Sequence, residues 1–239
     1  MKAKVKHYFR KAKQREYLKV LILRTIGNFL ILSSLFMITK TFYKPVREEV
    51  RYFLDTTVKK KYVVGTKEVK EAQELKAGGL KALFATNQVE VLVPEDPSFS
   101  VVIPKVGANA RVLANIDASD ENIYLPALQE GVAHTLGTAF PGERGHIFLF
   151  AHSTDYFWNV GTYNAVFYLL SKLVRGDEVN VFYKGQRYVY RVIGKRIVDP
   201  ERVEFLTRKT NNEFLTLQTC WPPGTTLKRL LIFATRAKQ

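Results

Sequence analysis

The stretch Thr216-Leu-Gln-Thr-Cys220-Trp-Pro-Pro-Gly224-Thr-Thr-Leu-Lys-Arg229-Leu-Leu-Ile-Phe-Ala234 contains the only cysteine of the chain. Residues 214–219 combine apolar side chains with two threonines, and residues 230–234 form a continuous apolar run, so both segments are typical of β-strands. The Pro-Pro-Gly sequence between them removes backbone donors and frees the backbone, which predicts a loop. Cys220 is therefore expected where one strand ends and Arg229 where the next begins. If the two strands are antiparallel neighbours, both side chains can face one groove.

A lone cysteine beside an arginine has two interpretations. It can be a buried structural thiol, because most free cysteines are buried, or a nucleophile whose thiolate is stabilised by nearby positive charge. The letters Thr-Leu-x-Thr-Cys, followed after eight residues by an arginine, resemble the active-site signature of sortases, a family of cell-surface cysteine transpeptidases. The resemblance implies that Cys220 is the nucleophile, that Arg229 supplies fixed positive charge and that Thr219 contacts substrate. The alternative for Thr219 is an ordinary β-branched strand residue.

The catalytic histidine has to be chosen among four. His7 falls in the basic N-terminal tail, His134 follows Gly-Val-Ala, His146 begins an apolar strand and His152 ends it. Sortases carry Gly-Asn, a short apolar strand and Gly-His-Ser at this distance before the cysteine, and Gly145-His146 to His152-Ser153 is similar to that pattern. His146 stands at the usual Asn and Ala151 at the usual Gly. The resemblance implies that His152 is the catalytic histidine.

A mainly β fold is expected for the second half of the chain. Predicted strands follow one another through short, turn-rich links without a helix after each, which favours a barrel or sandwich over βαβ units. Residues 179–183 and 187–193 predict a hairpin, residues 164–174 a helix, and residues 122–130 a short helix or extended stretch. The resemblance to sortases covers about residues 99–234. It implies a closed sortase-type β-barrel of about eight strands with one or two short helices.

The N-terminal part predicts a membrane anchor. Residues 1–16 are a basic tail, residues 17–38 an apolar segment long enough to span a bilayer, residues 39–87 a stalk or linker, and residues 88–239 the catalytic domain. The basic tail places the N-terminus in the cytoplasm and the catalytic domain outside a single-pass cell membrane protein. The alternatives are an interfacial or core helix for residues 17–38, and a small subdomain for the stalk, in which residues 69–76 could be helical.

Composition limits the remaining functions. The net charge of +15 is largely explained by membrane topology, so no nucleic-acid partner is expected. One cysteine excludes an internal disulfide and a multi-cysteine metal site, and no cofactor or metal is expected. A calcium site, which some sortases use, would need acidic loops, for which Glu121, Glu143 and Asp155 are weak candidates.

By resemblance, the expected function is that of a sortase. Such an enzyme cleaves a sorting signal like Leu-Pro-x-Thr-Gly near the C-terminus of an exported protein, forms a thioacyl-enzyme, and transfers the acyl group to an amine of the cell wall or a pilin. Asp96-Pro97-Ser98-Phe99 resembles the lid motif of pilin-polymerising sortases, with an ordinary turn as the alternative. Two further alternatives are a cysteine peptidase or other wall-modifying cysteine transpeptidase, and an inert membrane-tethered domain that binds wall polymers.

Overall fold

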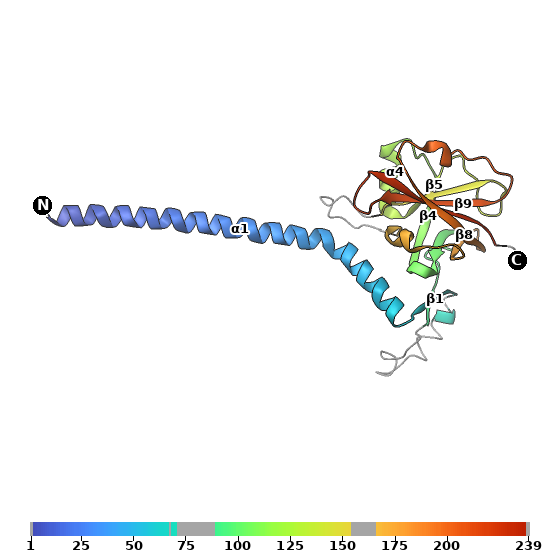
Figure 1. Ribbon diagram of the computed structural model, residues 1–239, viewed down its shortest axis with the longest axis horizontal. Coiled ribbons are helices and arrows are strands. Elements are labelled where there is room, and N and C mark those ends of the chain that lie inside the picture. Colours follow the sequence, from blue (N-terminus) through green and yellow to red (C-terminus); the bar gives the residue numbers. More distant parts are fainter. Residues whose placement is uncertain (1, 67, 71–88, 154–165, 238–239) are drawn as a thin grey trace. The chain divides into compact units, whose positions relative to one another are not determined.

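The computed structural model describes residues 2–66, 68–70, 89–153 and 166–237 (Figure 1). The chain divides into two compact units, residues 1–44 and residues 45–239. Helix α1, Lys2–Thr57, belongs to both units, and Pro45 lies inside it at the division between them.

The first unit consists of the N-terminal part of α1. Within it, Glu16–Lys40 is a stretch of 25 residues with a mean hydropathy of 1.9, and none of its apolar window is buried. At 1.5 Å per residue, a helix of this length exceeds the roughly 30 Å of a bilayer's hydrocarbon core. By length and composition the segment can therefore cross a membrane, and its exposure does not fit the alternative of a core helix.

The second unit is built on a closed barrel of eight strands in the order β10-β8-β7-β3-β4-β5-β6-β9. The expected closed barrel of about eight strands is confirmed. The strands are β3 Phe99–Ile103, β4 Ala108–Ile116, β5 Val132–Thr135, β6 His146–Phe150, β7 Glu178–Tyr183, β8 Gln186–Val198, β9 Phe214–Trp221 and β10 Lys228–Arg236. The helical elements in this part are α4, Glu121–Glu130, and the 3₁₀ turns η1 Pro104–Val106, η2 Tyr168–Lys172 and η3 Val203–Phe205.

Alternation along the strands separates two apolar clusters. One cluster fills the barrel, and on β6, β9 and β10 it takes every second residue, namely Ile147, Leu149, Leu215, Leu217, Leu230 and Ile232. The residues between them point outward, and Phe148, Phe150 and Leu231 form a second cluster with Leu128 of α4. The side chains packed against this outer cluster include Tyr124 of α4 and Phe205 of η3. The outer face of β6, β9 and β10 is thus flanked by α4 and by the segment after β8.

The helix predicted over residues 164–174 is wrong. Among the described residues of this range, only Tyr168–Lys172 is helical, and it is a 3₁₀ turn that ends at Leu173, whose backbone is extended. Leu169, Leu170 and Leu173 are all buried in the barrel core. Packing of these leucines at the barrel determines the local backbone more strongly than their helical spacing does.

The beginning of the expected stalk folds with the barrel. Strand β1, Lys61–Val64, pairs in parallel with β2, Val89–Leu92. In the part of α1 that belongs to the second unit, the Arg51 guanidinium donates to the Val106 carbonyl at 3.1 Å, and Glu49 pairs with Lys172 at 3.1 Å. Most of the helix predicted over residues 69–76 lies outside the described residues.

Candidate active site

The register of three neighbouring strands brings the predicted catalytic residues into one row. Strand β6 pairs in parallel with β9, with Phe150 opposite Gln218, and β9 pairs antiparallel with β10, with Cys220 opposite Arg229. His152 lies two residues beyond Phe150, and Cys220 lies two residues beyond Gln218. Because strands in a sheet are about 4.8 Å apart, this register places His152, Cys220 and Arg229 side by side at one end of the barrel.

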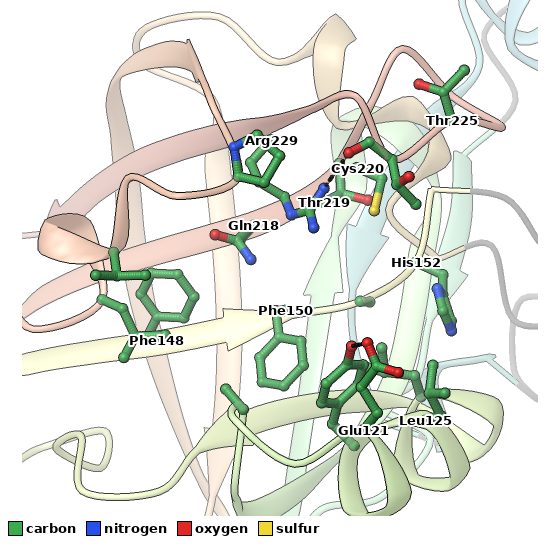
Figure 2. Close-up of a pocket in the computed structure, with 18 of the residues that line it drawn as sticks. Glu121, Leu125, Phe148, Phe150, His152, Gln218, Thr219, Cys220, Thr225 and Arg229 are labelled. Atoms are coloured by element: carbon green, nitrogen blue, oxygen red, sulfur yellow. Dashed lines mark hydrogen bonds between the residues drawn. The ribbon is translucent and has the colours of Figure 1, made fainter.

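The three side chains also share a face of the sheet. Leu217 and Leu230 point into the barrel, so their strand neighbours by alternation, Cys220 and Arg229, point outward. Figure 2 shows Cys220, Arg229 and His152 around one pocket. All three residues line this pocket.

The pocket has a volume of about 440 Å³, which is within the usual range for ligand sites. Its floor is the outer face of β6, β9 and β10, and its sides are α4, the segment after β8 and the loop between β9 and β10. The lining residues are Ala118, Glu121, Tyr124, Leu125, Leu128, Phe148, Phe150, Ala151, His152, Pro200, Arg202, Val203, Leu206, Gln218, Thr219, Cys220, Gly224, Thr225, Thr226 and Arg229. An apolar floor with polar groups at one end suits a peptide.

Cys220 is a free, half-buried thiol. Burial raises the pKa of this thiol, and the positive charge of Arg229 opposes that rise. The thiol is therefore mostly protonated at neutral pH. A base has to remove its proton before the sulfur can attack a carbonyl carbon.

His152 is a suitable partner for that proton. Burial lowers the pKa of its imidazole to about 4, so the ring is neutral near pH 7 and can accept a proton. The resting pair is therefore a neutral thiol and a neutral imidazole. The thiolate–imidazolium form is a minor species that has to be stabilised by its surroundings during the reaction.

Arg229 is held at the edge of the pocket by the loop between β9 and β10. Its Nη1 donates to the carbonyl oxygens of Thr226 at 3.0 Å and Lys228 at 3.2 Å. The loop is closed by Thr225, whose backbone N–H and hydroxyl both donate to the Pro222 carbonyl. These contacts hold the positive charge of Arg229 beside the sulfur. Both acceptors are backbone carbonyl oxygens, so these contacts do not neutralise the charge.

Thr219 lies on the opposite face of β9 from Cys220. It alternates with Leu215 and Leu217, which fill the barrel, and it is 3% exposed. Its hydroxyl has no hydrogen-bond partner among the described residues. Although Thr219 borders the pocket, this placement favours the packing role over the predicted contact with substrate.

The other described histidines have structural environments. His134 is fully buried: its Nδ1 accepts from the Asn115 N–H at 3.3 Å, which leaves Nε2 as the donor to the Ala139 carbonyl at 3.0 Å. His146 is also buried, with Nε2 at 2.8 Å from the Thr216 hydroxyl on the outer face of the barrel. Neither residue lines the pocket.

His146 makes the fold sensitive to acid. Burial and the charge of Arg208 lower its pKa from 6.5 to about 4, so the unfolded chain binds a proton more readily than the folded chain between these values. Stability is therefore lost as the pH falls from about 6.5 towards 4. Between pH 7.5 and 4.5, we expect the free energy of unfolding of His146→Asn to fall by about 2 kcal/mol less than that of the wild type, measured by urea unfolding. Thr216→Val keeps the imidazole, so it should lose as much stability as the wild type over this pH range. An equal loss of stability in the wild type and both variants would show that His146 is not the origin of the acid sensitivity.

Among the described lid and calcium candidates, Glu121 lines the pocket, whereas Asp96, Phe99 and Glu143 do not. The Asp96 carboxylate accepts a hydrogen bond from the Ser98 N–H at 2.7 Å, which forms an ordinary turn. Phe99 is buried in the barrel, and its ring centroid lies 5.1 Å from that of Tyr183. Glu143 accepts from the Phe140 N–H, and Asp155 lies outside the described residues. Among the described residues, no group of three His, Cys, Asp or Glu could hold a metal ion.

Gln218 and Glu121 are among the pocket residues that were not identified as site residues from the sequence. Gln218 is the variable letter of Thr-Leu-x-Thr-Cys, and strand alternation alone puts it on the same face as Cys220. Glu121 was considered only for calcium. Its position in the pocket depends on how α4 packs across the sheet, which no local pattern in the sequence indicates.

Comparisons with known proteins agree with this geometry. The family model described as the sortase domain matches residues 101–237. Sortase D of Bacillus subtilis (strain 168) is 28% identical over 137 residues, which are 56% of this chain and 61% of that protein, so the chain spans less than two thirds of this relative's length. The crystal structure of sortase C-1 from Actinomyces oris is 30% identical with a TM-score of 0.50, over 61% of this chain and 76% of that chain. A lid mutant of sortase A from Corynebacterium diphtheriae is 25% identical with a TM-score of 0.49, over 60% and 72%.

Proposed function

This chain belongs to the sortase family, and we propose that it is a membrane-anchored cysteine transpeptidase acting on sorting signals like Leu-Pro-x-Thr-Gly. The observation that carries the proposal is the row formed by His152, Cys220 and Arg229 at one end of a pocket with a mixed polar and apolar lining. These three residue types are those needed to exchange one amide bond for another.

The first half-reaction forms a thioacyl-enzyme. As Cys220 transfers its proton to His152, the sulfur attacks the carbonyl carbon of the Thr residue in the sorting signal. The resulting imidazolium donates that proton to the leaving amine, and the C–N bond breaks. Arg229 and a backbone N–H of the loop after Cys220 stabilise the oxyanion, and each such donor is typically worth about 3 kcal/mol.

The second half-reaction transfers the acyl group. An uncharged amine nitrogen attacks the thioester carbon, the C–S bond breaks, and His152 takes the proton that the nitrogen releases and returns it to the sulfur. The acceptor is an amine of a cell-wall precursor or a pilin lysine. Water is a slower acceptor that gives hydrolysis.

The proposed location is the outer face of a cell membrane. Residues 1–16 are cytoplasmic, residues 17–38 span the bilayer once, and the catalytic domain of residues 88–239, with the rest of the second unit before it, is extracellular. The support is the apolar stretch Glu16–Lys40, and eight Lys and Arg within residues 1–19 against a single Glu16. Exported proteins with a C-terminal sorting signal are then the donors.

The test of this function is ligation. The full-length chain in detergent is incubated with a library of sorting-signal peptides and an excess of amine, and the ligated products are sequenced. Peptides joined to the amine after Thr are the expected result. Hydrolysed peptide alone would favour a cysteine peptidase, and no turnover, with Cys220 labelled by a thiol reagent equally with and without peptide, would favour an inert wall-binding domain.

Arg229→Lys should lower kcat/KM for ligation by about 10²–10³-fold, because an ammonium cannot reproduce the planar fork of donors. Lys228→Arg is a matched control, since Lys228 pairs with Asp199 at 3.1 Å and does not line the pocket. Ligation near the wild-type rate in Arg229→Lys would show that only the positive charge matters.

A further inference from the structure

The charged groups of the pocket lie on two different sides. Arg229 is on β10 and Arg202 is on the segment after β8, whereas Glu121 is on α4. Figure 2 shows Glu121 and Leu125 across the pocket from Arg229. In the same view, His152 lies at the end of the pocket where Cys220 and Leu125 are. Of the described residues that line the pocket, Glu121 is the one with a carboxylate.

Glu121 is the acidic residue in the first turn of α4, where a negative charge favours the helix, but it is not the capping residue. Asp120 already caps α4, since its carboxylate accepts from the Asn122 N–H at 2.9 Å. Glu121 is exposed, and its carboxylate accepts a hydrogen bond from the Tyr124 hydroxyl at 3.2 Å. Tyr124 also packs against the outer apolar cluster, so this bond ties the carboxylate to a partly buried side chain at the pocket wall.

The chemistry of the second half-reaction supplies a cation for this carboxylate. An alkyl amine has a pKa near 10, so it arrives at neutral pH as an ammonium ion. Arg229 repels an ammonium that enters along its side of the pocket, whereas the charge of Arg202 is paired with Glu204. A carboxylate on the opposite wall attracts the ammonium and leaves the thioester beside Arg229 accessible to the deprotonated amine.

We propose that Glu121 binds the ammonium group of the incoming acceptor and so favours cationic amines over neutral nucleophiles. This inference rests on the proposed transpeptidase function. Because the carboxylate is exposed and screened by solvent, its effect is a few-fold selectivity and not a requirement for turnover. Tyr124 acts as a positioning residue that holds the carboxylate at the wall.

The experiment compares two acceptors in each variant of the full-length chain. One acceptor is the side chain of an N-acetyl-lysine amide, which is cationic at pH 7.5, and the other is hydroxylamine, which is uncharged there. In Glu121→Gln we expect the ratio of kcat/KM for the lysine acceptor to kcat/KM for hydroxylamine to fall about fivefold. The fall should shrink in high salt, which screens exposed charges.

Glu130→Gln is the matched control. Glu130 is at the other end of the same helix, pairs with Arg111 at 2.5 Å and does not line the pocket, so the same substitution there should leave the ratio unchanged. Tyr124→Phe should lower the ratio by a smaller factor than Glu121→Gln. Two donor peptides, one with Lys and one with norleucine at the x position, are also compared. This comparison tests whether Glu121 binds an ammonium group of the donor peptide instead of the ammonium group of the acceptor.

Three results would overturn the inference. They are an unchanged acceptor ratio in Glu121→Gln, an equal fall in Glu130→Gln, and a loss confined to the donor with Lys. Each can be told apart from failure of the proposed function, because in each the enzyme still forms the thioacyl intermediate and turns over the donor. If no thioacyl-enzyme forms in the wild type, the transpeptidase proposal itself fails.

Discussion

Cys220→Ala is expected to reduce ligation of a sorting-signal peptide to an amine by roughly 10⁴-fold or more, because no other group in the pocket can form the thioacyl intermediate. Cys220 is the only cysteine of the chain, so no neighbouring thiol can replace it. The measurement is ligated product by mass spectrometry, together with the mass of the enzyme after brief exposure to donor peptide. The wild type should gain the acyl mass and the variant should not.

The fold should survive this change. Cys220 is half-buried at the end of β9, and removing one sulfur atom there should alter stability by about 1 kcal/mol or less. Equal thermal unfolding would confirm that the loss of activity is chemical. Cys220→Ser is the closer control in shape, and it should also be inactive because a hydroxyl is the weaker nucleophile. Turnover near the wild-type rate in either variant would remove Cys220 as the nucleophile.

His152→Ala is expected to lower kcat/KM for ligation by about 10³-fold, within the range found for a general acid–base group. The physical reason is the protonation state of the pair. Burial raises the pKa of the Cys220 thiol and lowers that of His152 to about 4, so thiolate forms at neutral pH by passing its proton to the imidazole. Without the imidazole, the thiolate has to form against the full effect of burial.

Thiol alkylation separates this effect from simple damage to the site. In His152→Ala, the alkylation rate at pH 7 should fall, and it should recover as the pH rises towards the raised pKa of the thiol. His146→Asn is the matched control, because His146 is on the same strand but does not line the pocket. Ligation in His152→Ala within a few-fold of the wild type would exclude the general acid–base role and direct attention to His134.

The strands could be predicted because their signals are local, whereas the roles of His152, Cys220 and Arg229 were inferred from the resemblance to sortases. The apolar strand before His152, the two strands around Pro222-Pro223-Gly224 and the hairpin before Ile193 all have the alternation or apolar runs that β-structure requires. The helix predicted over residues 164–174 failed because its leucines are buried by the barrel in a 3₁₀ turn and extended chain. Local spacing cannot report such long-range packing.

The opposite wall of the pocket could not be predicted, and for the same reason. Glu121 lines the pocket only because α4 packs across strands that are distant in sequence. The orientation of Thr219, in contrast, follows from strict alternation with Leu217. The family resemblance to sortases placed Thr219 at the site, and Thr219 does border the pocket, although its alternation with Leu217 favours a packing role.

The parallel pairing of β6 with β9 also determines when the protein becomes reactive. These two strands are separated in sequence by β7 and β8, so His152 and Cys220 are brought together by a pairing between distant segments of the chain. Pairings between such distant segments form late, because loop closure opposes them. Until that pairing forms, we expect Cys220 to react as an ordinary thiol, without the imidazole of His152 beside it.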